Sequence, residues 1–193
     1  MTLTSLMVGG CLAGASFLGT PPASAESADT VEITITSGGL QSTVSAPKNM
    51  SAVVLGNGEQ RSTGTALAWT IIDARGSGAG WTLSASASDF TSAAGTAVDE
   101  RVPRTIGVAN LVITPGTVVA AGGADTAPGT RAVTMTTRAQ ALVSAPASGT
   151  GAKGSFVLSA PLFSLTVPAN AFRSNVGVDG VHPYTSTIVF TIA

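Results

Sequence analysis

The clearest strand and turn signals of the chain lie in residues 69–88, which read WTIIDARGSGAGWTLSASAS. Apolar and polar side chains alternate at both of its ends, which is the period of a β-strand with one buried face. Three glycines in residues 76–80 are typical of a turn, because glycine adopts backbone angles that other residues avoid. We therefore predict two strands joined as a hairpin. Their predicted inward-facing residues are Leu67, Trp69, Ile71, Trp81, Leu83, Ala85 and Ala87.

The same signals recur along the rest of the chain. Helical periodicity is nearly absent, and short segments rich in Thr, Val and Ile are separated by clusters of Gly, Pro, Asn and Asp. This pattern is typical of an all-β sandwich. The sequence predicts one domain over residues 26–193, an immunoglobulin-like β-sandwich of two mostly antiparallel sheets. The further strands that we expect are 31–36, 109–114, 131–143, 154–158, 162–167 and 184–192, with long loops at 122–130 and 171–183.

The composition excludes several functions. Only 10% of the 193 residues are charged and the net charge is −1, so the chain has no basic field to attract nucleic acid. A single Cys and a single His exclude an intrachain disulfide, a Cys-based zinc site and a multi-His metal centre. His182 lies in a predicted loop, and the sequence has no Gly-x-Ser-x-Gly elbow to supply a nucleophile. We expect no enzyme activity, no cofactor and no metal.

The first 25 residues are predicted to be a signal peptide. They carry no charged side chain, and an apolar run over 6–18 is followed by Pro21-Pro22 and Ala23-Ser24-Ala25. This order predicts export and cleavage before Glu26. The run is shorter than the roughly 20 apolar residues that span a bilayer, so we expect no membrane span. Residues 8–11, which end at Cys11, distantly resemble a lipoprotein-processing box. The apolar run continues beyond Cys11, which favours an ordinary signal peptide.

The same part of the sequence also resembles a known protein family. Residues 69–90, with the triplet Trp81-Thr82-Leu83, resemble the strand, loop and strand around the first motif of WxL-domain proteins, which are cell-surface proteins of Gram-positive bacteria. Residues 165–169 and Tyr184-x-x-x-Ile188 resemble the approach to the second motif of that family. Where the family has a second Trp-x-Leu, this chain has Phe190-Thr191-Ile192.

The resemblance implies a secreted protein that attaches without a covalent bond to the cell wall, either to peptidoglycan or to an associated glycopolymer. It implies localisation at the cell surface, no catalysis, and other surface proteins as further partners. An alternative is a protein-binding subunit of a surface complex or adhesive layer, in which the strand at 184–192 pairs with a neighbouring chain. The candidate motif or binding residues are Trp69, Trp81, Leu83, Tyr184, Phe190 and Ile192.

Three smaller questions remain open from the sequence. The two indoles are either core residues, which would make the motif a folding signature, or a partly exposed platform for sugar rings. Asp73 and Arg75 either pair with each other or contact an anionic polymer. The acidic residues Asp99, Glu100 and Asp125 lack regular calcium-loop spacing, which favours a solvated turn over a calcium site.

Overall fold

A computed structural model describes residues 31–147 and 153–193, and almost all of its regular structure is antiparallel β-sheet. The predicted all-β sandwich is therefore confirmed. All strands belong to the unit Thr36–Ala193. The predicted signal peptide, Cys11 included, lies outside the described residues. Within those residues, no helix is long and apolar enough to cross a membrane.

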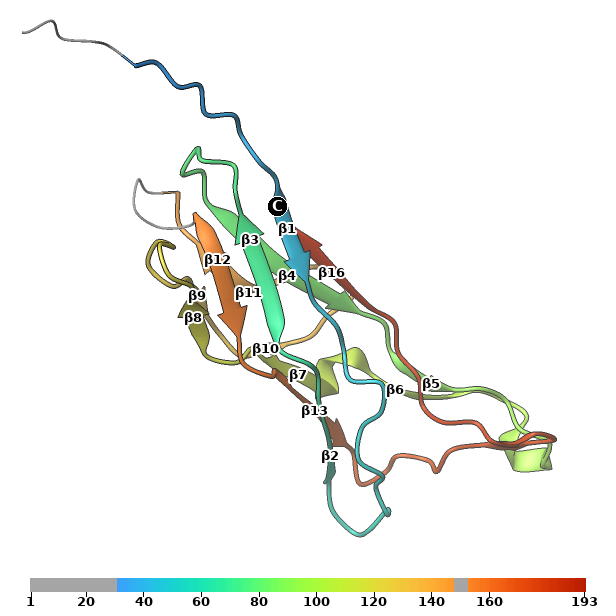
Figure 1. Cartoon of the computed structure of the whole chain (residues 1–193). Coiled ribbons are helices and arrows are strands. Elements are labelled where there is room, and N and C mark those ends of the chain that lie inside the picture. The colour runs from blue at the N-terminus through green and yellow to red at the C-terminus, as the bar shows by residue number, and fades with distance from the viewer. Residues whose placement is uncertain (1–30, 148–152) are drawn as a thin grey trace, which may run out of the picture. The chain divides into compact units, whose positions relative to one another are not determined.

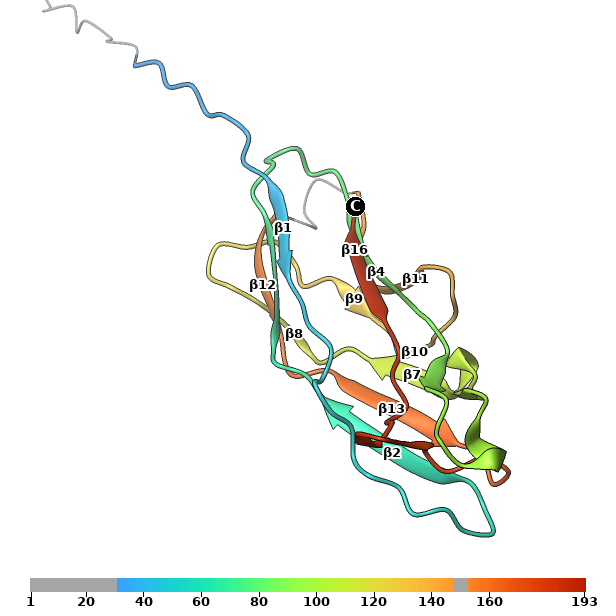
Figure 2. The same cartoon turned by 90° about the vertical axis from the view of Figure 1, so that its right-hand side faces the viewer.

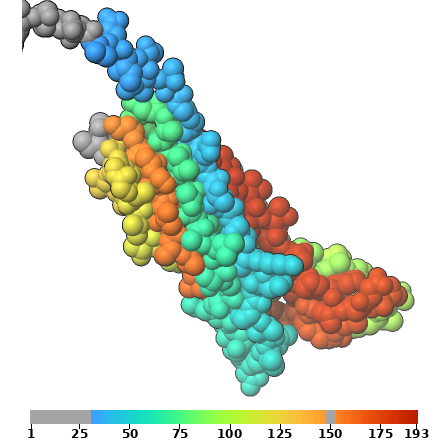
Figure 3. Space-filling model, in the orientation of Figure 1, coloured from blue at the N-terminus to red at the C-terminus, as the bar shows by residue number. Residues whose placement is uncertain are grey.

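The first layer contains three long strands that are each interrupted once, together with two short single strands (Figures 1 and 2). Sheet A has the order β1-β3-β12-β8 and sheet B the order β2-β13-β7-β10. Three residues separate β2 from β3, β7 from β8, and β12 from β13. Sheets A and B are therefore consecutive along the direction of these strands. Figure 3 shows the outer sides of β12, β3 and β1 next to each other. The strand bounds are β1 (Leu40–Thr43), β2 (Gln60–Thr65), β3 (Trp69–Asp73), β7 (Leu111–Thr114), β8 (Val118–Ala120), β10 (Val133–Thr134), β12 (Gly154–Leu158) and β13 (Leu162–Val167).

The interruption between sheets A and B is encoded in the sequence. Pro115 and Pro161 stand in two of the three links and cannot donate to a sheet hydrogen bond. Gly116 lies so close to the neighbouring link that a Cβ there would be 2.0 Å from the Ser159 carbonyl oxygen. The Thr117 amide donates to Ser159 Oγ, and the Ser159 amide donates to the Thr117 carbonyl, both at 2.9 Å. These bonds hold the two links together where the sheet bends.

The second layer is sheet C, with the order β16-β4-β11-β9. The alternation predicted for residues 81–87 is confirmed, since every odd-numbered residue there is buried. Strands β12 and β13 also match the predicted ranges. The core lies between the layers and is built mainly from apolar side chains. The bounds in this layer are β4 (Trp81–Ala87), β9 (Gly129–Thr130), β11 (Gln140–Ala145) and β16 (Ile188–Ile192).

A side lobe is formed by residues 90–107 and 171–185, which are joined by hydrogen bonds across about 80 positions of sequence. It contains two short strand pairs and one turn of 3-10 helix, and a second such turn, η2, leads from it into β7. The predicted loop 171–183 therefore includes a small hairpin. The bounds are β5 (Phe90–Ser92), η1 (Val98–Glu100), β6 (Arg104–Ile106), η2 (Val108–Asn110), β14 (Val176–Gly177) and β15 (Gly180–Val181).

Several predictions of local structure are wrong. Residues 31–36 form no strand, and Val31, Ile33 and Ile35 are 84–90% exposed. Alternation specifies which side chains share a face, but it does not supply the neighbouring strand that a sheet requires. The predicted strand 131–143 is divided between β10 and β11 by a turn. Leu67 precedes β3 and is 81% exposed.

The predicted hairpin of residues 69–88 is also wrong. Strand β3 lies in sheet A and β4 in sheet C, so the two strands face each other across the core and share no ladder. Residues 74–80 form an arch that spans the roughly 10 Å between packed sheets. A Cβ on Gly80 would lie 2.5 Å from the Ala145 carbonyl oxygen. This close approach explains why a glycine ends the arch.

Candidate functional site

Both indoles of the motif are interior. Trp69 is fully buried, its Nε1 donates to the Ser45 carbonyl at 2.9 Å, and its ring contacts Phe163 and Phe190 edge-on at centroid distances of 6.5 and 5.2 Å. Trp81 is 2% exposed, and its ring is tilted against Phe156 at 5.9 Å. The interpretation as an exposed platform is wrong for both residues, and the core interpretation is right.

The remaining motif residues divide between the core and its margin. Leu83 is fully buried beside Trp81 on β4. Phe190 and Ile192 are half-buried on β16, and the edge-on contact of Phe190 with Trp69 joins the two layers. Tyr184 precedes β16 and donates its hydroxyl to the Phe172 carbonyl at 3.0 Å, and burial raises its pKa. The structure thus brings Phe190 to Trp69, but it does not gather the six residues into one exposed site.

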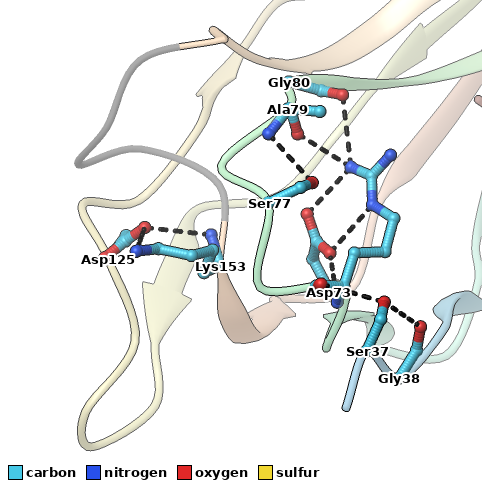
Figure 4. A network of polar contacts seen from close by, with 9 residues as sticks. Ser37, Gly38, Asp73, Ser77, Ala79, Gly80, Asp125 and Lys153 are labelled. Atoms are coloured by element: carbon cyan, nitrogen blue, oxygen red, sulfur yellow. Dashed lines mark hydrogen bonds and ion pairs between the residues drawn. The ribbon is translucent and has the colours of Figure 1, made fainter. Parts of the chain in front are cut away.

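The arch between β3 and β4 is organised by one ion pair (Figure 4). The Arg75 Nε donates to Asp73 Oδ1 at 3.0 Å, and Nη2 lies 2.9 Å from Oδ2. The same Nη2 donates to the carbonyls of Ala79 at 2.8 Å and Gly80 at 3.2 Å. Asp73 and Arg75 therefore pair with each other, and the guanidinium also closes the loop. These hydrogen bonds lower the pKa of the Asp73 carboxyl, against the opposing effect of burial.

The lowered Asp73 pKa predicts a loss of stability in acid. An unfolded Asp titrates near 3.9, so the unfolded chain takes up this proton before the folded chain does as the pH falls. The contribution of Asp73 is complete above about pH 5 and declines as the pH falls through the folded pKa. We expect the urea midpoints of wild type and Asp73→Asn to differ near neutral pH and to approach each other as the pH falls from about 5 through the lowered folded pKa of Asp73. A difference that stays constant across this range would contradict the prediction.

The two acidic residues at 99 and 100 differ: Asp99 is exposed, as a solvated turn predicts, whereas Glu100 is buried. Glu100 is 3% exposed, and its Oε2 accepts the Val176 amide at 2.8 Å. Its Oε1 forms no hydrogen bond within the described residues and has the Arg173 guanidinium as its ion-pair partner. The partners of Glu100 come from a segment more than 70 positions away, so local sequence could not reveal them. Within residues 31–147 and 153–193, no group of three or more metal-ligating side chains occurs.

His182 lies in the same lobe. Its Nδ1 is 3.4 Å from the Ala93 carbonyl oxygen, its backbone carbonyl accepts Ser92 Oγ at 2.6 Å, and its amide donates to the Asn175 carbonyl. In the described part of the chain, neither an acidic nor a hydroxyl side chain hydrogen-bonds the ring.

Sheet C presents the most regular polar surface. Because β4 buries its odd-numbered residues, its even-numbered residues point outward next to their cross-strand neighbours on β16 and β11. Ser84 lies opposite Thr191, and Thr82 lies opposite Ser144. We call this surface the hydroxyl face, and it bears no charged side chain. It consists of Thr82, Ser84, Ser86, Ser144 and Thr191.

A shallow groove of about 230 Å³ lies at one end of the hydroxyl face. Its hydroxyls come from β4 and the residue after it, from a turn at residue 137 and from the residue before β16. These segments are distant in sequence, which is why sequence reasoning did not identify the groove. The hydroxyls of Ser86, Thr137 and Thr187 make no hydrogen bond to other described residues, whereas Ser88 Oγ accepts the Thr187 amide at 3.0 Å. The lining residues are Ser86, Ala87, Ser88, Thr137, Thr187 and Val189.

Comparison with known proteins identifies no relative: no protein-family model, no curated protein and no solved structure matches this chain.

Proposed function

We propose that this chain is a secreted surface protein that attaches without a covalent bond to the bacterial cell wall, through peptidoglycan or an associated glycopolymer. The proposal rests on the resemblance of residues 69–90 to WxL-domain proteins and on one structural feature, the hydroxyl face with its groove. Together these define a β-sandwich with an uncharged polar surface and a buried motif. The motif residues stabilise the fold, and the surface binds the polymer.

The chemistry of the hydroxyl face suits a polyhydroxylated ligand. A Ser or Thr hydroxyl donates one hydrogen bond and accepts two, so a row of such groups complements the mixed donors and acceptors of a sugar polymer. Neighbouring strands repeat these groups every 4.7–4.9 Å, and alternate residues along a strand repeat them about every 7 Å. Val189 adds an apolar contact within the groove. Because both indoles are buried, binding depends on hydrogen bonding and shape rather than on stacking by tryptophan.

Sedimentation with insoluble peptidoglycan tests this proposal. Wild-type protein is expected to pellet with purified sacculi. A triple variant, Ser86→Ala, Thr137→Val and Thr187→Val, is expected to remain mainly in the supernatant. Each lost hydrogen bond weakens binding by about 0.5–1.5 kcal/mol, so three of them lower the affinity by more than about tenfold. Far-UV circular dichroism establishes that the variant is folded.

The outer side of the first layer offers a matched control. Thr43→Val, Thr65→Val and Thr114→Val remove three exposed hydroxyls that also make no hydrogen bond to other described residues. This control triple variant is expected to pellet like wild type. Folded wild-type protein that stays in the supernatant would overturn the proposal. Equal loss of binding in both triple variants would overturn the assignment to the groove.

A protein-binding role in a surface complex is the second candidate, and one observation favours it. Five large apolar side chains of the side lobe are each 58–88% exposed, and contact with a protein partner would remove them from water. Cross-linking on intact cells distinguishes the two functions, because a protein partner gives a discrete higher-mass adduct and a wall polymer does not. The exposed residues are Val98, Val102, Phe172, Val178 and Val181.

A further inference from the structure

Strand β16 leaves one edge of sheet C unpaired. Thr82 and Ala193 exchange two backbone hydrogen bonds, at 2.7 and 3.2 Å. Opposed residues in an antiparallel pair alternate between bonded and non-bonded pairs, so Ile188, Phe190 and Ile192 direct their amides and carbonyls away from β4. The Ala87 amide donates to the Thr136 carbonyl on the opposite side, as this alternation requires. No outward group of these three β16 residues has a hydrogen-bond partner within the described residues.

The β16 edge also lacks the features that normally protect an edge strand. Proteins usually cover such edges or place a charge, a proline or a bulge on them. Residues 188–192 read IVFTI and include none of these. The other outer strands are shorter or partly covered. Strand β1 has four residues, β8, β9 and β10 have two or three each, and residue 51 hydrogen-bonds along β2.

The apolar side chains beside this edge are only half-buried. Ile188, Phe190 and Ile192 point inward from β16, and Leu40 and Val44 lie on and after β1, the neighbouring edge of the first layer. Figure 3 shows β1 and β16 next to each other at this side of the sandwich. We call these five residues the apolar seam. A strand added to β16 would cover the seam with its inward-facing side chains.

The chain contains a segment of the required type that belongs to no sheet. Residues 31–36 read VEITIT and alternate β-branched apolar residues with polar ones. Val31, Ile33 and Ile35 are 90%, 84% and 86% exposed, which is unusual for three regularly spaced apolar residues. The six residues are long enough to pair with all five residues of β16.

We propose that residues 31–36 of one chain add to the β16 edge of a second copy, so that sheet C continues from one subunit into the other. Val31, Ile33 and Ile35 cover the apolar seam of the acceptor, and Thr34 and Thr36 continue its outer polar surface. The main-chain bonds hold the segment, and the alternating apolar side chains specify its register. The donor and acceptor surfaces differ, so the contact is head-to-tail and produces chains of subunits.

Hydrogen bonds beside the segment favour donation to another molecule. Ser37 Oγ donates to the Arg75 carbonyl at 2.9 Å, the Gly38 amide donates to the Ala74 carbonyl at 2.9 Å, and the Ala74 amide donates to the Gly39 carbonyl at 3.0 Å. These bonds fix the backbone directly after residue 36. A tight reversal that returned the segment to its own sandwich, beside β1 and β16, needs about two turn residues and would break these bonds.

Two single substitutions in the segment provide a matched test. Ile33→Asp places a charge on the inward-facing side of the donor, and Thr34→Asp places the same charge on its outward-facing side. Sedimentation velocity from about 1 to 100 μM is expected to show concentration-dependent oligomers for wild type and for Thr34→Asp. Ile33→Asp is expected to raise the concentration needed for assembly by more than about tenfold. Neither residue contributes to the described core, so the monomer should remain folded.

Amide hydrogen exchange gives a second measurement. In assembled wild type the Phe190 and Ile192 amides are expected to be protected, and in Ile33→Asp they are expected to exchange rapidly at the same concentration. A wild-type protein that is monomeric throughout would overturn the proposal, as would oligomers that Ile33→Asp leaves unchanged. Because Ile33→Asp leaves the groove intact, its pelleting with peptidoglycan separates this proposal from the proposed function.

Discussion

Trp69→Ala is expected to lower the free energy of unfolding by about 3–5 kcal/mol, the usual effect of removing a large buried aromatic side chain. Trp69 is the largest fully buried side chain of the described core. Its ring lies between Phe163 of the first layer and Phe190 of the second, so its removal opens a cavity where the layers meet. Urea unfolding followed by circular dichroism measures the change.

Trp69→Phe serves as the control for this prediction. It keeps an aromatic ring in the same place but loses the Nε1 bond to the Ser45 carbonyl, which then lacks its donor. We expect a smaller loss, about 1–3 kcal/mol, which separates ring packing from the hydrogen bond. A loss under about 1 kcal/mol for Trp69→Ala would contradict the assignment of this indole to the core.

Phe190 shows how the altered second motif can still serve the fold. In the proposed relationship to WxL-domain proteins a tryptophan stands at this position, and here a phenylalanine meets Trp69 edge-on at 5.2 Å. Edge-on aromatic pairs contribute about 0.5–1.5 kcal/mol beyond the area that they bury. The aromatic contact between the layers therefore does not need a second indole. Trp69 and Phe190 thus act in this chain as residues that pack the two layers together.

The sequence was sufficient to predict features that depend on residues close together in the chain. Residues 81–87 alternate because β4 has one face in the core and one in solvent, and this periodicity was predicted correctly. The pairing of Asp73 with Arg75 was among the sequence alternatives because the residues are two positions apart. In both cases the residues that determine the structure are close together in sequence.

The sequence failed where distant segments decide the outcome. A glycine-rich connection suits a hairpin or an arch equally well, and contact of Gly80 with the Ala145 backbone selects the arch. The burial of Glu100 depends on residues 173 and 176, which are distant in sequence. The predicted solvated turn is therefore wrong for Glu100. The groove was missed because its hydroxyls come from β4, a turn at residue 137 and the approach to β16.

Asn175→Ala is expected to unfold the side lobe while the sandwich remains folded. Asn175 is 1% exposed, and its Nδ2 donates to the carbonyls of Ala93 and Val102, both at 2.9 Å. These bonds tie the two halves of the lobe together, since the carbonyls belong to residues 90–107 and Asn175 to residues 171–185. Removing the amide leaves the Val102 carbonyl without its donor and leaves the Ala93 carbonyl only the His182 ring nitrogen, at 3.4 Å. At about 1–3 kcal/mol for each carbonyl that loses the amide, the expected loss is about 2–6 kcal/mol.

This loss should be local, because the lobe has little apolar core of its own and opens as a separate unit. Hydrogen exchange is expected to accelerate at residues 91–106 and to stay slow in β4 and β12. Asn170→Ala is the matched control, since Asn170 is exposed and makes no hydrogen bond to other described residues. If Asn175→Ala exchanges like Asn170→Ala, the amide does not hold the lobe. If β4 and β12 accelerate equally, the lobe and the sandwich unfold as one unit.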